Sequence, residues 1–189
     1  MGNKHNNRNK LHYSMIDKIL EVNDALLNQG LEDHSKLFVM RLDIRFPRGT
    51  DQRKISTFNQ RFVEKEKYRK YDPKYIAVRE ISSQGNVHYH IGLLLNGNIT
   101  DGTHVHFENA KIVLQNIIGS GHSVCGLIDK CNHGYKNGIM LSRKDINAGD
   151  TTALEEVRRQ LSYLAKKDQK QDVKGKRFFT SIRRRKKRS

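Results

Sequence analysis

Two histidines separated by one residue, and a glutamate eight residues before the first of them, are the side chains whose types and spacing point most directly to chemistry. His88, Tyr89 and His90 lie within an apolar run that is typical of a β-strand. Because successive side chains of a strand point to opposite faces, both imidazoles project from one face and Tyr89 from the other. Glu80 lies on the preceding apolar run, so its carboxylate reaches the imidazoles if the two runs pair with a suitable register. These three residues are the candidate metal ligands.

The ligand types indicate which ion such a site would hold. Two neutral imidazoles and one carboxylate, with coordination positions left open, suit a divalent ion that acts as a Lewis acid on a phosphate oxygen. We expect Mn²⁺ or Mg²⁺, and favour Mn²⁺ in vitro because Mg²⁺ prefers a shell of oxygen ligands. The alternative is that both histidines lie on a hydrated strand face and Glu80 is an ordinary exposed glutamate.

Tyr163 is the candidate nucleophile. The apolar residues of the last predicted helix form one stripe at helical spacing, and Tyr163 falls nearly opposite that stripe, beside Arg159. Lys166 and Lys167 follow at i+3 and i+4, where they can offset the charge of a phosphate or a phenolate. A tyrosine is a weak nucleophile at neutral pH, so such a site needs a metal-polarised phosphodiester and nearby cations. The alternative is an exposed helical tyrosine that lies on DNA.

Other residues are of the right type to be metal ligands or the nucleophile. His104 and His106 form a second His-x-His, but turn residues and a helix flank it, so we expect it at the surface. The spacing of four further residues does not match the usual paired zinc ligands, and we expect a hairpin with two reduced thiols there: His122, Cys125, Cys131 and His133. Tyr68 and Tyr71 are the runners-up for the nucleophile.

The charge balance predicts a polyanionic partner. The chain has 36 Lys and Arg against 20 Asp and Glu, a net charge of +16, and a pI near 10. Nucleic acid is therefore the leading partner. Much of the excess lies in the last 16 residues, where a basic run should add salt-sensitive affinity for phosphates. Beyond Arg159 and Lys167, the predicted DNA contacts are Arg183, Arg184, Arg185, Lys186, Lys187 and Arg188.

The cysteine count and the distribution of apolar residues indicate the compartment and the domain organisation. Only two cysteines are present, the polar start lacks the apolar core of a signal peptide, and no apolar run is long enough to cross a bilayer. We therefore expect a cytoplasmic protein with no membrane partner and no disulfide. We predict a loose polar arm over residues 1–11, one domain over 12–173 and a basic tail over 174–189.

The apolar pattern predicts how the elements position these residues. Strands are expected at 37–46, 75–81 and 87–95, with the last two joined as a hairpin through the turn-prone residues 82–86, and a further hairpin over 123–141. Helices are expected from about Met15 to a stop at Gly30, over 54–70 and 107–118, and from Thr152, with Glu155 completing a capping box, to about Lys167. Together these predict an α+β domain whose mainly antiparallel sheet carries helices on one or both faces.

Three segments, taken in chain order, resemble the motifs of the HUH endonucleases, which are rolling-circle replication initiators and relaxases. The segments are the strand 37–46, His88-Tyr89-His90 and Tyr163-Leu164-Ala165-Lys166. With Leu93-Leu94-Leu95-Asn96-Gly97 and the run 175–181, the chain is most similar to the replication proteins of filamentous phages and related prophages. The sequence departs from the pattern at Arg41 and Asp43, where initiators more often carry hydroxyl residues.

The resemblance implies a five-stranded antiparallel sheet of the HUH and RRM-like type, with the histidine pair on a central strand. It implies that Tyr163 cuts single-stranded DNA at an origin or nick site, leaving a 5′-phosphotyrosine and a free 3′-hydroxyl. Glu80, His88 and His90 would hold the ion and Lys166 would support the phosphate or the metal. The cut would initiate rolling-circle replication of a phage, prophage or mobile element. No phosphate-binding Gly-x-x-x-x-Gly-Lys loop is present, so a helicase of the host or element would unwind the DNA.

Two rival functions remain open from the sequence. A nonenzymatic nucleic-acid-binding protein would use the same histidines, tyrosines and basic tail to contact phosphates and bases. A site-specific nickase directed against a competitor genome would keep the chemistry and change its purpose.

Overall fold

The computed structural model describes residues 4–47, 49–51, 53–81, 87–131, 136–165 and 178–181. In chain order the elements are α1 (Lys4–Asp33), β1 (Lys36–Arg45), α2 (Arg53–Tyr68), β2 (Lys74–Ile81), β3 (Val87–Asn96), α3 (His104–Ile118), β4 (Ile128–Asp129), β5 (Ile139–Ser142), α4 (Arg143–Asn147), α5 (Thr152–Ser162), the 3₁₀ turn η1 (Tyr163–Ala165) and β6 (Phe178–Thr180). None of these helices is long and apolar enough to span a bilayer.

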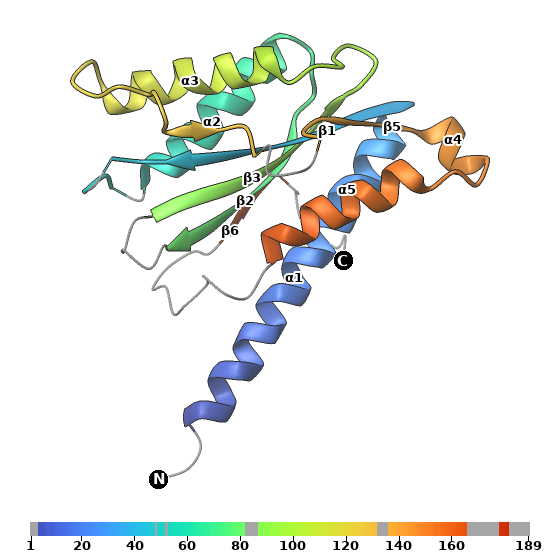
Figure 1. Ribbon diagram of the computed structural model, residues 1–189, viewed down its shortest axis with the longest axis horizontal. Helices are drawn as coiled ribbons and strands as arrows, with labels where there is room; N and C mark the ends of the chain where they lie inside the picture. The colour runs from blue at the N-terminus through green and yellow to red at the C-terminus, as the bar shows by residue number, and fades with distance from the viewer. Residues whose placement is uncertain are drawn as a thin grey trace, which may run out of the picture.

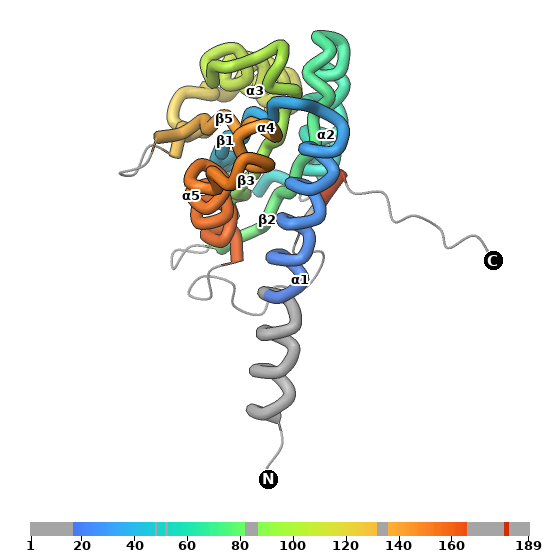
Figure 2. Tube along the Cα trace, turned by 90° about the vertical axis from the view of Figure 1, so that its right-hand side faces the viewer, coloured from blue at the N-terminus to red at the C-terminus, as the bar shows by residue number. Residues whose placement is uncertain are grey.

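One antiparallel sheet forms the centre of the molecule. Its strands run in the order β4-β1-β3-β2-β6, and β5 pairs with β1 as well. Helices α2 and α3 cover one face, and α1 and α5 cover the other (Figures 1 and 2). The parts of β1 and β3 that lie under helices on both sides are continuously apolar, over 37–40 and 91–95. The predicted α+β class with a mainly antiparallel sheet is confirmed.

The face under α1 and α5 changes character along its length. Below the helices it is apolar, with Val39, Val78 and Leu94 in the core. Along the same strands, Asp43, Glu80 and His90 share that face, as their pairing and the strand alternation require. The sheet therefore supplies a packed floor and, next to it on the same face, a group of polar side chains.

Two glycines let helices approach this face closely. A Cβ on Gly92 of β3 would lie 2.8 Å from Leu161 Cδ2 and 3.2 Å from Leu164 Cδ1. A Cβ on Gly30 of α1 would lie 2.7 Å from Leu37 Cδ1. Gly30 was expected to end the first helix, but α1 continues to Asp33, because this glycine makes room for Leu37 and is not a helix stop.

Other predicted boundaries also need correction. The backbone is helical from Lys4, so most of the segment expected to be a loose arm belongs to α1. The hairpin predicted over 123–141 is not seen among the described residues of that segment, where β4 and β5 each pair with the same edge of β1. The N-cap of α5 is Thr151 and not the predicted Thr152, and its side chain makes no capping hydrogen bond to the helix backbone. Its hydroxyl donates instead to the Glu155 carboxylate at 2.9 Å, and the α-helical part ends at Ser162, before the predicted end near Lys167.

The hairpin that carries the candidate ligands is confirmed in its pairing. Strands β2 and β3 are antiparallel, and Glu80 lies directly opposite His88. The predicted turn, residues 82–86, lies outside the residues that the structure describes. Tyr89 points away from the histidines into the core beneath α2 and α3, as the strand alternation predicts.

Candidate active site

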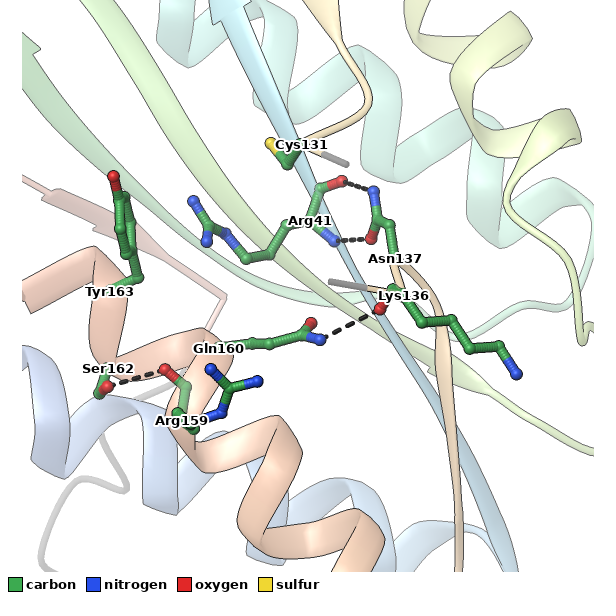
Figure 3. A pocket seen from close by; sticks show the side chains of 8 residues that line it. All are labelled: Arg41, Cys131, Lys136, Asn137, Arg159, Gln160, Ser162 and Tyr163. Atoms are coloured by element: carbon green, nitrogen blue, oxygen red, sulfur yellow. Dashed lines mark hydrogen bonds between the residues drawn. The ribbon is translucent and has the colours of Figure 1, made fainter. Parts of the chain in front are cut away.

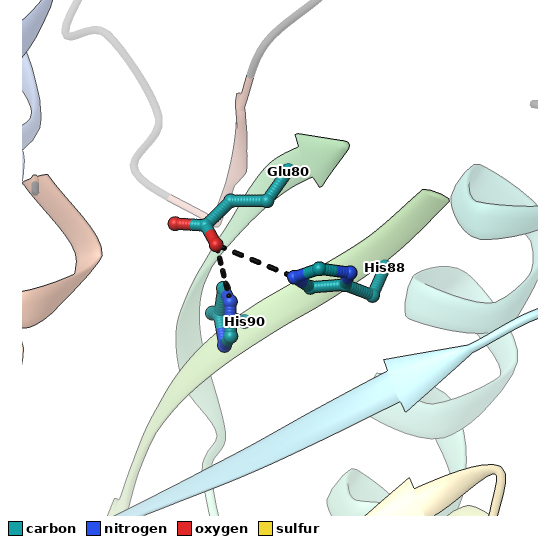
Figure 4. Close-up of side chains that lie close together, drawn as sticks. All are labelled: Glu80, His88 and His90. Carbon is teal, nitrogen blue, oxygen red and sulfur yellow. Dashed lines mark hydrogen bonds and ion pairs between the residues drawn. The ribbon is translucent and has the colours of Figure 1, made fainter. Parts of the chain in front are cut away.

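The carboxylate of Glu80 lies between the two imidazoles (Figure 4). Its Oε2 is 2.8 Å from His90 Nε2 and 3.3 Å from His88 Nε2. Cross-strand pairing puts the glutamate opposite His88, and the two-residue period of β3 puts His90 on the same face. Glu80 and His90 are buried and His88 is partly exposed, so an ion at this point would keep one side accessible.

These donor atoms fit a divalent ion. One ligand atom from each of Glu80, His88 and His90 lies within 4.8 Å of the others. Ligands at about 2.1 Å from an ion, at right angles to each other, are separated by about 3 Å, which matches the two distances from the Glu80 oxygen. Among the described residues, this is the group of three or more His, Cys, Asp and Glu side chains that could hold a metal.

Asp43, on the neighbouring strand β1, orients the candidate ligand His90. Its position on β1 is opposite His90, and its Oδ1 is 2.6 Å from His90 Nδ1. A carboxylate on the second ring nitrogen fixes the orientation of a metal-binding histidine and leaves Nε2 for the ion. Sequence reasoning noted Asp43 only as a departure from a motif. Asp43 could have been identified as a polar side chain within an apolar strand. Strand alternation places it on the same face as the candidate ligands.

The two carboxylates change the protonation of His90. Burial lowers the pKa of His90, but the hydrogen bonds to Asp43 and Glu80 outweigh burial and raise this pKa to about 9. Burial in turn raises the pKa of Asp43, while the hydrogen bond to His90 and the charge of that ring bring it below its usual value. Without metal, His90 is therefore an imidazolium between two carboxylates at neutral pH.

Tyr163 meets this group from the end of α5. Its ring centroid is 6.4 Å from that of His90, and the Arg41 guanidinium lies 4.7 Å over its face. The side chain is 41% exposed, which confirms that it is not part of the core. Leu161 and Leu164, on either side of it in the chain, pack against Gly92 of β3. The side chain of Asn23 in α1 also donates a hydrogen bond to the Leu161 carbonyl at 3.1 Å.

The structure thus brings together four of the predicted site residues: Glu80, His88, His90 and Tyr163. Arg159 is one turn before Tyr163 in α5, lines a cleft beside that tyrosine and pairs with Glu156 at 2.6 Å. The remaining predicted residues lie outside the described part of the chain: Lys166, Lys167, Arg183, Arg184, Arg185, Lys186, Lys187 and Arg188. Arg41, whose role was not predicted, lies between the tyrosine and Asp43.

The alternative candidates lie elsewhere. Tyr68 is 87% exposed at the end of α2, and Tyr71 packs against His106 with ring centroids 4.9 Å apart. The expectation that His106 is at the surface is wrong: it is fully buried, with Nδ1 2.7 Å from Glu66 Oε2 and Nε2 2.9 Å from the Thr100 hydroxyl. His106 therefore links α3, which carries it, to Glu66 on α2.

His122, Cys125 and Cys131, which were weighed as zinc ligands and not favoured, do not form a metal-binding group among the described residues. Cys125 and Cys131 both carry free thiols, the first exposed and the second buried. Burial and the nearby Asp43 carboxylate raise the pKa of Cys131. His133 lies outside the described residues.

The fold and the site define the class: an α+β domain with a helix-end tyrosine beside a Glu-His-His group on its central hairpin. The chain belongs to the family described as the YagK/YfjJ C-terminal domain, whose model matches residues 2–181. The comparison with curated proteins gives no match. Among solved structures, the chain is similar to the catalytic domain of the adeno-associated virus type 5 Rep protein, with a TM-score of 0.38 and 14% identity over 68% of this chain and 97% of that one.

Proposed function

We propose that the protein is a metal-dependent enzyme that nicks and joins single-stranded DNA, with Tyr163 as its nucleophile. The observation that carries the proposal is the 6.4 Å separation between the ring centroids of Tyr163 and His90. Glu80, His88 and His90 form the group that could hold Mn²⁺ or Mg²⁺. A partly exposed phenol beside a potential metal centre suits a covalent phosphoryl transfer, because tyrosine can act as the nucleophile and a metal can activate the reaction.

The chemistry is a transfer of a phosphodiester from sugar to tyrosine. The Tyr163 oxygen attacks the scissile phosphorus, a bond from this oxygen to phosphorus forms, and the bond from phosphorus to the 3′ oxygen breaks. The phenol loses its proton to water, and the departing 3′ oxygen takes a proton from water. The products are a 5′-phosphotyrosine and a free 3′-hydroxyl. Because the phosphodiester bond is exchanged and not hydrolysed, the same steps in reverse join the strand.

The chain's own residues prepare this step. Glu80, His88 and His90 would hold the ion, and Asp43 keeps the His90 ring oriented. A bound divalent ion would supply Lewis-acid polarisation of a phosphate oxygen. Arg41 places a positive charge over the Tyr163 ring, where negative charge develops on the phenol oxygen and the phosphate.

A reversible cut suits the initiation and termination of strand-displacement replication. We therefore assign the enzyme to rolling-circle replication of a phage, prophage or mobile element, with origin DNA as substrate. Strand separation would come from a separate helicase.

The test is covalent capture from a labelled library of single-stranded oligonucleotides in the presence of Mn²⁺. We expect an adduct that survives denaturation with the wild-type protein and none with Tyr163→Phe. Tyr68→Phe is the matched control, because this exposed tyrosine lies at the end of α2, and it should form the adduct normally. Salt-sensitive DNA retention without an adduct would make the protein a binder and refute the proposal.

A further inference from the structure

A cleft lies beside Tyr163, between the end of α5 and the edge of β1 (Figure 3). Its volume is about 170 Å³. Arg41 and Asn137 form one wall, and Arg159, Gln160 and Tyr163 form the other. The Gln160 amide donates to the Lys136 carbonyl at 3.1 Å and so joins the two walls. None of the candidate metal ligands lines this cleft, so it is a separate compartment that shares Arg41 and Tyr163 with the reaction centre.

Arg41 is the unusual member of this cleft. Its side chain is 12% exposed, and its nearest carboxylate oxygen, Oδ1 of Asp43, is 3.9 Å from Nη2. That same oxygen is 2.6 Å from His90 Nδ1. Arg41 Nε is buried and has no hydrogen-bond partner among the described residues. A buried guanidinium with such weak compensation is costly, and an anion between its donors would remove that cost.

The backbone of Arg41 is held rigidly. Between the segments where β4 and β5 pair with β1, the Asn137 side chain takes the place of a neighbouring strand. Its Oδ1 accepts from the Arg41 N–H at 2.9 Å, and its Nδ2 donates to the Arg41 carbonyl at 2.7 Å. The guanidinium points from this clamped backbone toward Tyr163 (Figure 3). A cation that is fixed in this way can bind an anion without a large loss of side-chain entropy.

The charges of the described residues that line the cleft indicate which kind of anion it can bind. Its charged side chains are the cations of Arg41 and Arg159, and no carboxylate is among the described lining residues. Lys136 lines the cleft through its backbone, and its ammonium group points away from it (Figure 3). The remaining polar groups are amides and hydroxyls, which suit phosphate and sugar oxygens. Arginine donors match the oxygens of a phosphate group in particular.

We propose that this cleft binds the backbone phosphate next to the one that Tyr163 attacks, with Arg41 as its principal ligand and Arg159 as a second cation. The inference rests on the proposed function, since it places a second phosphate of the same DNA strand. Binding at this point fixes the strand on one side of the tyrosine, while the Glu-His-His group acts on the scissile phosphate.

Thymidine 3′,5′-bisphosphate is a probe that needs no knowledge of the DNA target. The Arg41 Nε–H resonance of the full-length protein can be assigned by its loss in Arg41→Lys and followed by NMR during titration. We expect this resonance to shift with the bisphosphate and not with thymidine, and Arg159→Gln to weaken the apparent affinity at least threefold. Lys144→Gln removes the same charge from exposed α4 and should leave the affinity unchanged. An Arg41 resonance that does not respond to the bisphosphate would refute the assignment.

Cleavage supplies the second arm of the test. With an oligonucleotide that forms the Tyr163 adduct, Arg41→Gln should slow adduct formation at least tenfold, Arg159→Gln should slow it less, and Lys144→Gln should have no effect. Arg159 is exposed, so its variant tests the cleft without disturbing the core. Bisphosphate binding at Arg41 without any adduct would refute the nuclease and leave an anion site. An adduct that forms at the wild-type rate in Arg41→Gln would refute the cleft and leave the nuclease.

Discussion

At the scale of single residues, His90 links the protonation of the site to its metal. One ring nitrogen faces Asp43 and the other faces Glu80, so in the metal-free protein both nitrogens can donate to carboxylates. An ion needs the Nε2 lone pair and must displace the proton there, whereas the proton on Nδ1 can stay with Asp43. The same two contacts that orient the ligand therefore make metal binding dependent on pH.

We predict that Mn²⁺ binding at pH 7 releases about one proton, because the pKa of His90 is raised to about 9 and the ring is protonated before the metal arrives. The apparent affinity should fall as the pH is lowered from 9, and the proton release should disappear above that pH. Titration calorimetry in buffers of different ionisation enthalpy measures the released proton. Heats that do not depend on the buffer at pH 7 would contradict the prediction.

The same pKa has a consequence for folding. A raised pKa means that the folded state holds the proton more tightly than the unfolded state, whose histidine titrates near 6.5. The stabilisation is fully present below pH 6.5 and is lost as the pH rises through about 9. In Asp43→Asn this loss should be smaller, because one of the two carboxylates is gone. Asp101→Asn, at an exposed position, should behave as wild type.

At the scale of elements, the packing of α5 on β3 decides where Tyr163 lies. Gly92 offers no side chain, so Leu161 and Leu164 settle directly on the strand, two residues from His90. The hydrogen bond from Asn23 to the Leu161 carbonyl adds a second restraint from α1. The height of the tyrosine above the ligand face is thus set by apolar contacts and by one hydrogen bond.

Gly92→Ala should therefore lower adduct formation while Mn²⁺ binding persists. The added methyl group must push back Leu161 and Leu164, and such overpacking costs roughly 1 to 3 kcal/mol in the free energy of unfolding. Urea unfolding, Mn²⁺ titration and adduct formation measure the three quantities. Gly102→Ala is the control, since a Cβ there meets nothing within 4 Å. Full adduct formation by Gly92→Ala would show that Tyr163 does not depend on this contact.

The buried pair of His106 and Glu66 joins α3 to α2 on the other side of the sheet. Both side chains are fully buried, and Asn109 completes the contacts of the carboxylate at 2.8 Å. Replacing one partner leaves a buried polar group with fewer partners, so His106→Leu should lower the free energy of unfolding by about 3 kcal/mol. His104→Leu, two residues away and exposed, should change it little. Equal stability of the two variants would refute the structural role of His106.

At the scale of the whole molecule, the sheet separates stability from chemistry. Helices α2 and α3 pack on one face over a continuous apolar core, whereas α1 and α5 cover only the apolar part of the other. The uncovered polar part holds the ligand group, and the end of α5 reaches its border (Figure 1). Long-range attraction for DNA would come from the net charge of +16, independently of this local geometry.

Removal of residues 183–189 should weaken binding of single-stranded DNA and flatten its salt dependence. Six basic residues are lost, and on single strands each phosphate contact contributes about 0.7 to the slope of log affinity against log salt, so the slope should fall by up to about 4. Mn²⁺ binding should not change. The double variant His88→Ala with His90→Ala is the converse control and should keep its salt slope but form no adduct. A slope that the truncation leaves unchanged would show that the tail does not contact phosphates.

Local rules were enough to predict the Glu-His-His group from the sequence. Alternation along a strand sets the face of each side chain, and a short hairpin restricts which residues can lie opposite each other, so Glu80, His88 and His90 converge through contacts within 11 residues of chain. Helical periodicity likewise showed that Tyr163 is not a core residue. The class of fold followed from the same periodicities.

Only the tertiary structure decided what surrounds that group. Arg41 and Asp43 looked like departures from a motif, and their roles depend on the pairing of β1 with β3 and on the seat of α5 over Gly92. His106 looked like a surface residue and is buried, because α2 brings Glu66 to it from 40 residues away. Such contacts arise from packing between elements distant in the chain. Residue periodicity describes one element at a time and carries no information about that packing.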